Sequence, residues 1–230
     1  MIISQIFLQL YPDKTINDFP IFIKSKTAYE KLGTYQLIGD KEADLLMIQY
    51  PEFYEMWKEV KYSIMKVDIL RFIILYHYGG LVSDLDIIPL KTEYKMEDTI
   101  LIYSPNVLFN YEVIISKPKQ EIFLSFLRYV KEQIQIKNEL PIYKVWKARY
   151  VFQTSGPHSF KRFIKKHKDK FKIVEKINRL NKRGDENGWE DNDFVSLQCS
   201  SWLNSMGVKQ TNRIKYTLQN EILNNKDKPL

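Results

Sequence analysis

The feature that most constrains the fold is a long apolar segment that changes its periodicity at a pair of glycines. Over residues 63–78, apolar side chains recur at steps of three and four, which predicts a helix that packs into the core. Gly79-Gly80 then offers the left-handed backbone that commonly ends a helix. A mainly apolar run over residues 81–88 predicts a buried strand, which Pro89 closes. A buried helix followed at once by a buried strand is typical of α/β folds.

The rest of the chain alternates predicted strands and helices. This alternation predicts a mainly parallel sheet flanked by helices. We expect one domain over residues 1–223 and a polar tail over residues 224–230. The further predicted strands are residues 2–10, 34–38, 100–103, 113–116 and 171–175, and the further predicted helices are residues 42–48, 51–60, a segment opened by Pro118, and residues 158–167.

Composition removes several classes of protein. With 44% apolar and 14% aromatic residues in a chain of 230, intrinsic disorder is excluded. Cys199 is the only cysteine, so no internal disulfide can form, and the three histidines lack the spacing of a helical zinc motif. No stretch approaches the roughly 18 apolar residues that a membrane-spanning helix needs, and no signal peptide is evident, so we expect a soluble chain in a cytosolic setting.

Asp84-Leu85-Asp86 is the first candidate for chemistry. On an extended strand, residues two apart point to the same side, so both carboxylates would share one patch while Leu85 turns into the core. Adjacent carboxylates repel unless a proton or cation lies between them, and a hard divalent ion suits their oxygen atoms. The end of such a strand is also where open α/β sheets bind ligands. A second match, Asp191-Asn192-Asp193, falls in a polar segment where solvation is the simpler explanation.

Asp68 and Arg71 interrupt the apolar sequence of the predicted helix three residues apart. Alone, they are explained by an intrahelical ion pair at a partly exposed edge. The whole of residues 67–86, however, closely resembles the helix, Gly-Gly, strand and Asp-x-Asp signature of glycosyltransferase family 32, the DXD sugar-binding-region enzymes. That family is similar to the glycosylating domains of large clostridial toxins. The resemblance implies a GT-A type fold, with a Rossmann-like sheet between helices.

The resemblance also implies a nucleotide-sugar donor held through Mn²⁺ or Mg²⁺. Asp84 and Asp86 would be the catalytic pair, with Asp86 binding the metal and Asp84 contacting the donor and the metal shell. Asp68 and Arg71 would bind sugar hydroxyls, and Gly80 would belong to the donor-binding segment.

Weaker similarities extend over most of the chain. Residues 3–7, Ile-Ser-Gln-Ile-Phe, resemble the family's first strand, usually Ile-His-Gln-Ile-Trp, so the resemblance places Phe7 near the nucleotide base. Residues 154–157, Thr-Ser-Gly-Pro, are similar to the family's Thr-Gly-Pro segment. Ser201-Trp202 resembles a pair that closes over the pyrophosphate, with Ser201 in the metal shell and Trp202 donating to a phosphate. The family often has a histidine shortly before that pair and a tyrosine where Val82 stands, and both are missing here.

We therefore predict a metal-dependent glycosyltransferase. It would move a hexose or N-acetylhexosamine, with retention, from a nucleotide sugar, preferably a UDP-sugar, to a glycan, protein or lipid-linked acceptor. Because the expected soluble form without a signal or anchor differs from the family's secretory-pathway members, we expect a microbial or viral source. One alternative is a degenerate relative that binds nucleotide sugars without turnover.

The other alternative is a basic protein that binds polyanions. The net charge is +7, and residues 158–176 hold eight Lys or Arg against two acidic residues. The helix predicted over residues 158–167 has an apolar face that we expect to be buried. The simplest explanation for its lysines is therefore that they form the solvated face. The stripe has no reader motif and no interleaved aromatic residues, which argues against nucleic acid as the partner.

Overall fold

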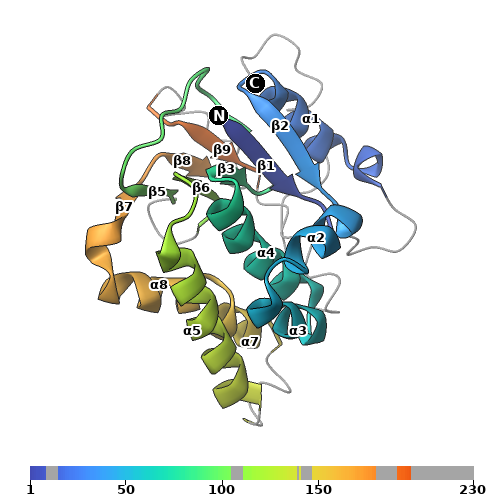
Figure 1. The fold of residues 1–230 in the computed structure, drawn as a ribbon. Helices are drawn as coiled ribbons and strands as arrows, with labels where there is room; N and C mark the ends of the chain where they lie inside the picture. Colours follow the sequence, from blue (N-terminus) through green and yellow to red (C-terminus); the bar gives the residue numbers. More distant parts are fainter. Residues whose placement is uncertain (9–14, 105–110, 139, 141–146, 180–190, 198–230) are drawn as a thin grey trace.

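The computed structural model describes residues 1–8, 15–104, 111–138, 140, 147–179 and 191–197. Its centre is a six-stranded sheet with the order β2-β1-β3-β6-β5-β7 (Figure 1). β6 is antiparallel to both of its neighbours, whereas the other neighbouring pairs are parallel, so five strands run in one direction. The mainly parallel sheet is therefore confirmed. The strands are β1 Ile2–Ile6, β2 Thr34–Ile38, β3 Gly80–Ser83, β5 Ile100–Tyr103, β6 Val113–Ser116 and β7 Phe171–Val174.

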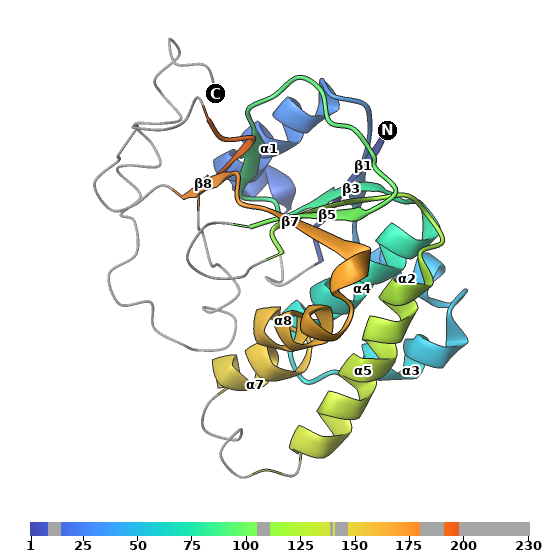
Figure 2. The same cartoon turned by 90° about the vertical axis from the view of Figure 1, so that its left-hand side faces the viewer.

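Helices cover both faces of this sheet. Seen along its edge in Figure 2, α1 lies on one side, and α4, α5 and α8 lie on the other. None of the helices in the described part of the chain is long and apolar enough to cross a membrane. The helices are α1 Pro20–Glu30, α2 Asp40–Met47, α3 Pro51–Glu59, α4 Ser63–His77, α5 Glu121–Asn138, α7 Lys147–Thr154 and α8 Pro157–Lys166, with short 3₁₀ turns at Ile16–Asp18 and Lys168–Lys170.

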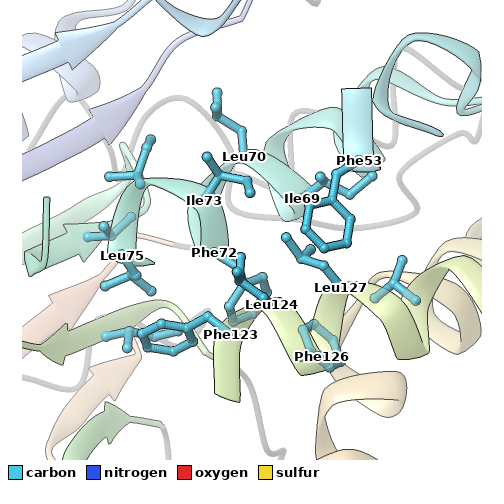
Figure 3. Packing of buried hydrophobic residues seen from close by; sticks show 14 of the residues in the cluster. Phe53, Ile69, Leu70, Phe72, Ile73, Leu75, Phe123, Leu124, Phe126 and Leu127 are labelled. Atoms are coloured by element: carbon cyan, nitrogen blue, oxygen red, sulfur yellow. The ribbon is translucent and has the colours of Figure 1, made fainter. Parts of the chain in front are cut away.

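The helix predicted over residues 63–78 is α4, and it contributes to the larger hydrophobic core. Its residues 68–75 are all buried, including the charged positions. Phe72 packs against α5, with its ring centroid 4.7 Å from that of Phe126 (Figure 3). It also packs against α8, with its ring centroid 5.0 Å from that of Phe160. Because close-packed aromatic rings fix both distance and direction, this packing holds α4 firmly against its neighbours.

Two glycines connect α4 to β3 through left-handed backbone, with φ of +65° at Gly79 and +85° at Gly80. A Cβ atom on Gly80 would lie 2.1 Å from the carbonyl oxygen of Ile2. Glycine is therefore required at this position, because β3 could not otherwise approach β1 this closely.

The single strand predicted over residues 81–88 is wrong. β3 ends at Ser83, a turn covers residues 84–87, and a new strand, β4 Ile87–Pro89, leaves for a second sheet of order β4-β9-β8. Its partners are β8 Ile177–Arg179 and β9 Phe194–Ser196. A strand that is buried on both faces cannot easily hold two carboxylates that are two residues apart. The chain therefore leaves the main sheet at Asp84 and Asp86. This second sheet and helix α1 were not predicted.

The basic segment behaves as an amphipathic helix followed by an edge strand. In α8, Phe160, Phe163 and Ile164 are buried while Lys161 and Lys165 are exposed. The prediction that these lysines form a solvated face is confirmed for this helix.

Candidate active site

The 84–87 turn lies at the carboxyl ends of two parallel strands. β1 and β3 pair with Gln5 opposite Ser83, so the residues after each strand, Phe7 and Asp84, reach the same edge of the sheet. The Ile87 amide donates to the Asp84 carbonyl oxygen at 3.3 Å and closes the turn. Asp84 and Asp86 thus lie on a turn and not on one face of a strand, which corrects the predicted geometry.

Arg71 reaches from α4 to this turn. Its Nη2 donates to Oδ1 of Asp84, and its Nη1 donates to the carbonyl oxygen of Tyr111. The Arg71 side chain is buried, whereas 34% of the Asp84 side chain is exposed. The intrahelical pair with Asp68 is therefore wrong as the simple explanation, because the guanidinium forms its ion pair with Asp84. Burial alone would lower the pKa of Arg71, but the neighbouring Asp84, Tyr111 and Asp68 raise it.

Asp68 is buried one helical turn before Arg71. Its Oδ2 accepts a hydrogen bond of 2.7 Å from the hydroxyl of Ser155. The Tyr111 hydroxyl lies 3.3 Å from Oδ1 of Asp68 and 2.9 Å from the carbonyl oxygen of Ser155. Burial raises the pKa of Asp68 to about 6, although Arg71 and the hydrogen bond from Ser155 oppose this rise. Asp68 therefore changes charge within the range in which enzymes usually work.

A further carboxylate, Glu112, lies beside Asp84. Glu112 is buried, and its carbonyl oxygen accepts a hydrogen bond of 3.0 Å from the Asp84 amide. Burial raises the pKa of Asp84, Arg71 lowers it, and the charge of Glu112 raises it further. Asp68 and Asp84 therefore act on the buried guanidinium of Arg71, and Glu112 is a third acidic group beside Asp84.

Tyr111 and Glu112 were missed from the sequence. They precede β6, and because β6 runs antiparallel to β3, its beginning lies at the edge where β3 ends. The sequence does show a charged residue, Glu112, directly before an apolar strand. This pattern indicates a site residue only when the direction of that strand is known.

The other predicted site residues are distributed as follows. Phe7 is half-buried, and its ring packs edge-on against Phe19 and Phe22 with centroids 6.1 and 6.4 Å away. Leu85 is half-buried against the same apolar cluster. Gly80 lies at the opposite end of β3 from Asp84 and has the packing role described above. Ser201 and Trp202 lie outside the described residues, as does the predicted polar tail.

The carboxylates of the turn can be compared with the needs of a divalent ion. Among the described residues, no three His, Cys, Asp or Glu side chains gather as a complete metal site. Asp84 and Asp86 offer two carboxylates. Oδ1 of Asp84 already accepts a hydrogen bond from Arg71. Mg²⁺-like ions are commonly bound by one or two carboxylates together with substrate phosphates and water. This donor set therefore fits an ion that the protein and a phosphorylated ligand hold jointly.

Comparison with known proteins connects this region to one class of enzyme. Residues 18–107 match the family model of the glycosyltransferase sugar-binding region containing the DXD motif. The matched residues run from the end of the first 3₁₀ turn to just beyond β5, and they include Asp68, Arg71 and the 84–87 turn.

A similar protein and a similar structure extend this result. The chain is 32% identical over 105 residues to mannosyl phosphorylinositol ceramide synthase CSH1 of Saccharomyces cerevisiae, a match that covers 43% of this chain and 27% of that protein. The solved structure of the PaToxG glycosyltransferase superimposes with a TM-score of 0.51 at 13% identity, covering 97% of this chain and 82% of that one. This likeness confirms the expected GT-A type fold.

Proposed function

The matched region, the yeast relative and the fold all indicate a glycosyltransferase, and we propose that this chain transfers a hexose or N-acetylhexosamine from a nucleotide sugar. A UDP-sugar is the preferred donor, with Mn²⁺ or Mg²⁺ as the cofactor. The acceptor is a glycan, a protein or a lipid-linked sugar, and the transfer proceeds with retention.

The observation that carries this proposal is the contact between Arg71 and Asp84. It joins the Asp-x-x-Arg of α4 to the Asp-x-Asp of the turn, so two motifs that are separate in the sequence form one group of polar side chains. Within the described residues, Nε of buried Arg71 has no hydrogen-bond partner. Because an unpaired buried donor is costly, a functional reason for keeping a guanidinium at this position is expected.

Asp68 and Asp84 have different tasks in this proposal. Ionised Asp68 accepts hydrogen bonds from sugar hydroxyls, while Arg71 fixes the direction of the Asp84 carboxylate. Asp86, the second oxygen of Asp84 and Ser201 would hold the divalent ion. When bound, that ion neutralises the charge that develops on the departing diphosphate. Phe7 lies at the same edge of the sheet, where its ring can contact the nucleotide base.

The reaction exchanges one bond at the anomeric carbon for another. The bond from this carbon to the diphosphate oxygen breaks, and the acceptor oxygen forms the new bond from the same face. The departing phosphate oxygen takes the proton of the acceptor hydroxyl, so the chain needs no general base of its own. Arg71 and the carboxylates act by holding the donor in place and by electrostatic stabilisation.

A second donor and a second acceptor should also be assayed. The yeast relative, mannosyl phosphorylinositol ceramide synthase, is named for a mannosyl group and an inositol-containing ceramide. GDP-mannose with a lipid-linked acceptor is therefore the alternative to a UDP-hexose.

The proposal is tested with a panel of UDP-sugars and GDP-mannose, each with Mn²⁺ or Mg²⁺ and with EDTA as the control. We expect nucleotide release from one donor class, lost with EDTA and restored by excess metal, and an NMR spectrum of the product that shows the anomer of the donor. Donor binding without release would support the degenerate nucleotide-sugar-binding alternative. Release that is insensitive to EDTA would overturn the metal dependence.

A further inference from the structure

Behind the 84–87 turn, a buried polar network connects β1, β2 and α1. Gln5 of β1 is fully buried at its centre. Its Nε2 donates to the Asp84 carbonyl oxygen at 3.0 Å and to the hydroxyl of Ser25 at 2.9 Å, and its Oε1 accepts from the Tyr35 hydroxyl at 3.0 Å. A carbonyl can only accept, so the contact with Asp84 fixes which way the amide faces.

The same network reaches the other end of the turn. The hydroxyl of Ser25, which accepts from Gln5, donates to the carbonyl oxygen of Ile87 at 2.5 Å. Gln5 and Ser25 together therefore bind the carbonyl oxygens of the first and last residues of the turn. Both donors come from well-packed elements, β1 and α1, so the turn is bound to a rigid part of the fold.

A second pair of side chains supports the beginning of the turn. Tyr29 of α1 is fully buried, and its hydroxyl donates to Ser83 Oγ at 2.8 Å. Ser83 Oγ in turn lies 3.0 Å from the Asp84 carbonyl oxygen. Such a chain of satisfied buried hydrogen bonds holds its members in one arrangement.

We propose that Gln5 is a positioning residue, which aims the carboxylates of Asp84 and Asp86 by fixing the backbone of the turn from behind. The side chain of Asp84 is held from the opposite side by Arg71, so backbone and carboxylate have separate supports. This inference rests on the proposed function, because the carboxylates matter only if they bind the donor and its metal. Small displacements of ligating groups are known to be expensive in enzyme sites.

The test is Gln5→Met, which keeps the volume and flexibility of the side chain, removes all three hydrogen bonds and buries no new charge. The matched control is Gln36→Met on β2, because Gln36 donates to Ser4 Oγ at 2.7 Å and so loses a hydrogen bond of the same kind. For Gln5→Met we expect kcat to fall about 10- to 100-fold and the Mn²⁺ concentration for half-maximal activity to rise about tenfold. We expect Gln36→Met to keep both values within about twofold of the wild type.

A readout without turnover separates this proposal from the proposed function. In hydrogen–deuterium exchange, peptides that cover residues 84–87 should exchange about tenfold faster in Gln5→Met than in the wild type, and not in Gln36→Met. If the wild type turns over no donor, the proposed function fails, yet this comparison still decides whether Gln5 holds the turn.

Unchanged exchange and unchanged kinetics in Gln5→Met would overturn the proposal, as would equal effects in both variants. If Gln5→Met does not fold, Ser25→Ala takes its place. It removes only the bond to Ile87 and the acceptor for one amide proton, and the same two readouts should move in the same direction. A folded Ser25→Ala with wild-type exchange and kinetics would then be the contradicting result.

Discussion

At the scale of single residues, the site is assembled from charges that the protein holds at a cost. Asp68 is buried, and its contacts with Ser155 and Tyr111 do not offset the desolvation of its ionised form, since its pKa is raised. A neutral side chain of the same shape would stabilise the fold more than Asp68 does. Stability alone therefore does not explain an aspartate at this position. The raised pKa is thus consistent with a functional carboxylate.

This cost leads to a prediction for Asp68→Asn. The pKa of Asp68 is about 6 in the folded protein against 3.8 for an ordinary aspartate, so the folded state binds the proton more tightly. The stability that this proton provides is complete below pH 4 and is lost as the pH rises through 6. At pH 7.5, Asp68→Asn should therefore raise the free energy of unfolding by about 1–3 kcal/mol, while transfer activity is lost.

Urea denaturation at pH 7.5 and pH 4 measures this difference. The gain should shrink towards pH 4, where wild-type Asp68 is itself neutral. Asp44→Asn, at an exposed position on α2, is the control and should show no such change between the two pH values. A loss of stability in Asp68→Asn at pH 7.5 would show that its ionised carboxylate stabilises the fold.

At the scale of secondary structure, local patterns predicted elements well where local forces decide them. The span of α4 follows from its apolar periodicity and from the glycines that end it, and β2 Thr34–Ile38 was predicted at its observed bounds. The division of residues 81–88 into β3 and β4 could not be predicted in this way. It depends on the pairing of β4 with β9, a strand more than 100 residues later in the sequence.

Gly80 offers a test of how tightly these elements are joined. Gly80→Ala must accommodate a Cβ that meets the Ile2 carbonyl oxygen and a φ that alanine rarely adopts. We expect it to lower the free energy of unfolding by about 2–4 kcal/mol. The control is Gly39→Ala, because Gly39 has φ of −91° and the nearest atom to an added Cβ is the flexible end of the Glu42 side chain at 3.0 Å. We expect Gly39→Ala to lower the free energy of unfolding by about 1 kcal/mol or less.

Urea denaturation at one pH compares the two variants. Equal losses of stability would mean that β3 can move away from β1 without penalty, and the close packing of these two strands would then be no constraint on the site.

At the scale of the whole molecule, the sheet separates two layers of helices, and both layers contribute side chains to the sheet edge that carries the 84–87 turn. Figure 2 shows α1 on one side of the sheet and α4 on the other. From α4 come Asp68 and Arg71, while α1 provides Ser25 and Tyr29 behind the turn. The sheet between them carries the turn itself, so the site needs both layers of the fold.

The sequence predicted the charged side chains of α4 and the turn much better than the polar residues that support them. Asp68, Arg71 and Asp84 were identified from their motifs, and the structure brings them together. Four polar residues were missed because they lie in separate elements or directly before one: Gln5, Ser25, Tyr111 and Glu112. Their importance depends on strand order and strand direction, which a single sequence does not encode in any local pattern.

In the proposed function, metal-dependent transfer from a nucleotide sugar depends on the carboxylates of the 84–87 turn, and one comparison of variants measures this dependence. Nucleotide release is measured with saturating donor and Mn²⁺ for the wild type, for Asp86→Asn, and for Asp191→Asn, an exposed aspartate of the second Asp-x-Asp sequence. We expect the rate of nucleotide release to fall at least about 100-fold in Asp86→Asn and to stay at the wild-type value in Asp191→Asn. A wild-type rate in Asp86→Asn, with sensitivity to EDTA retained, would contradict it.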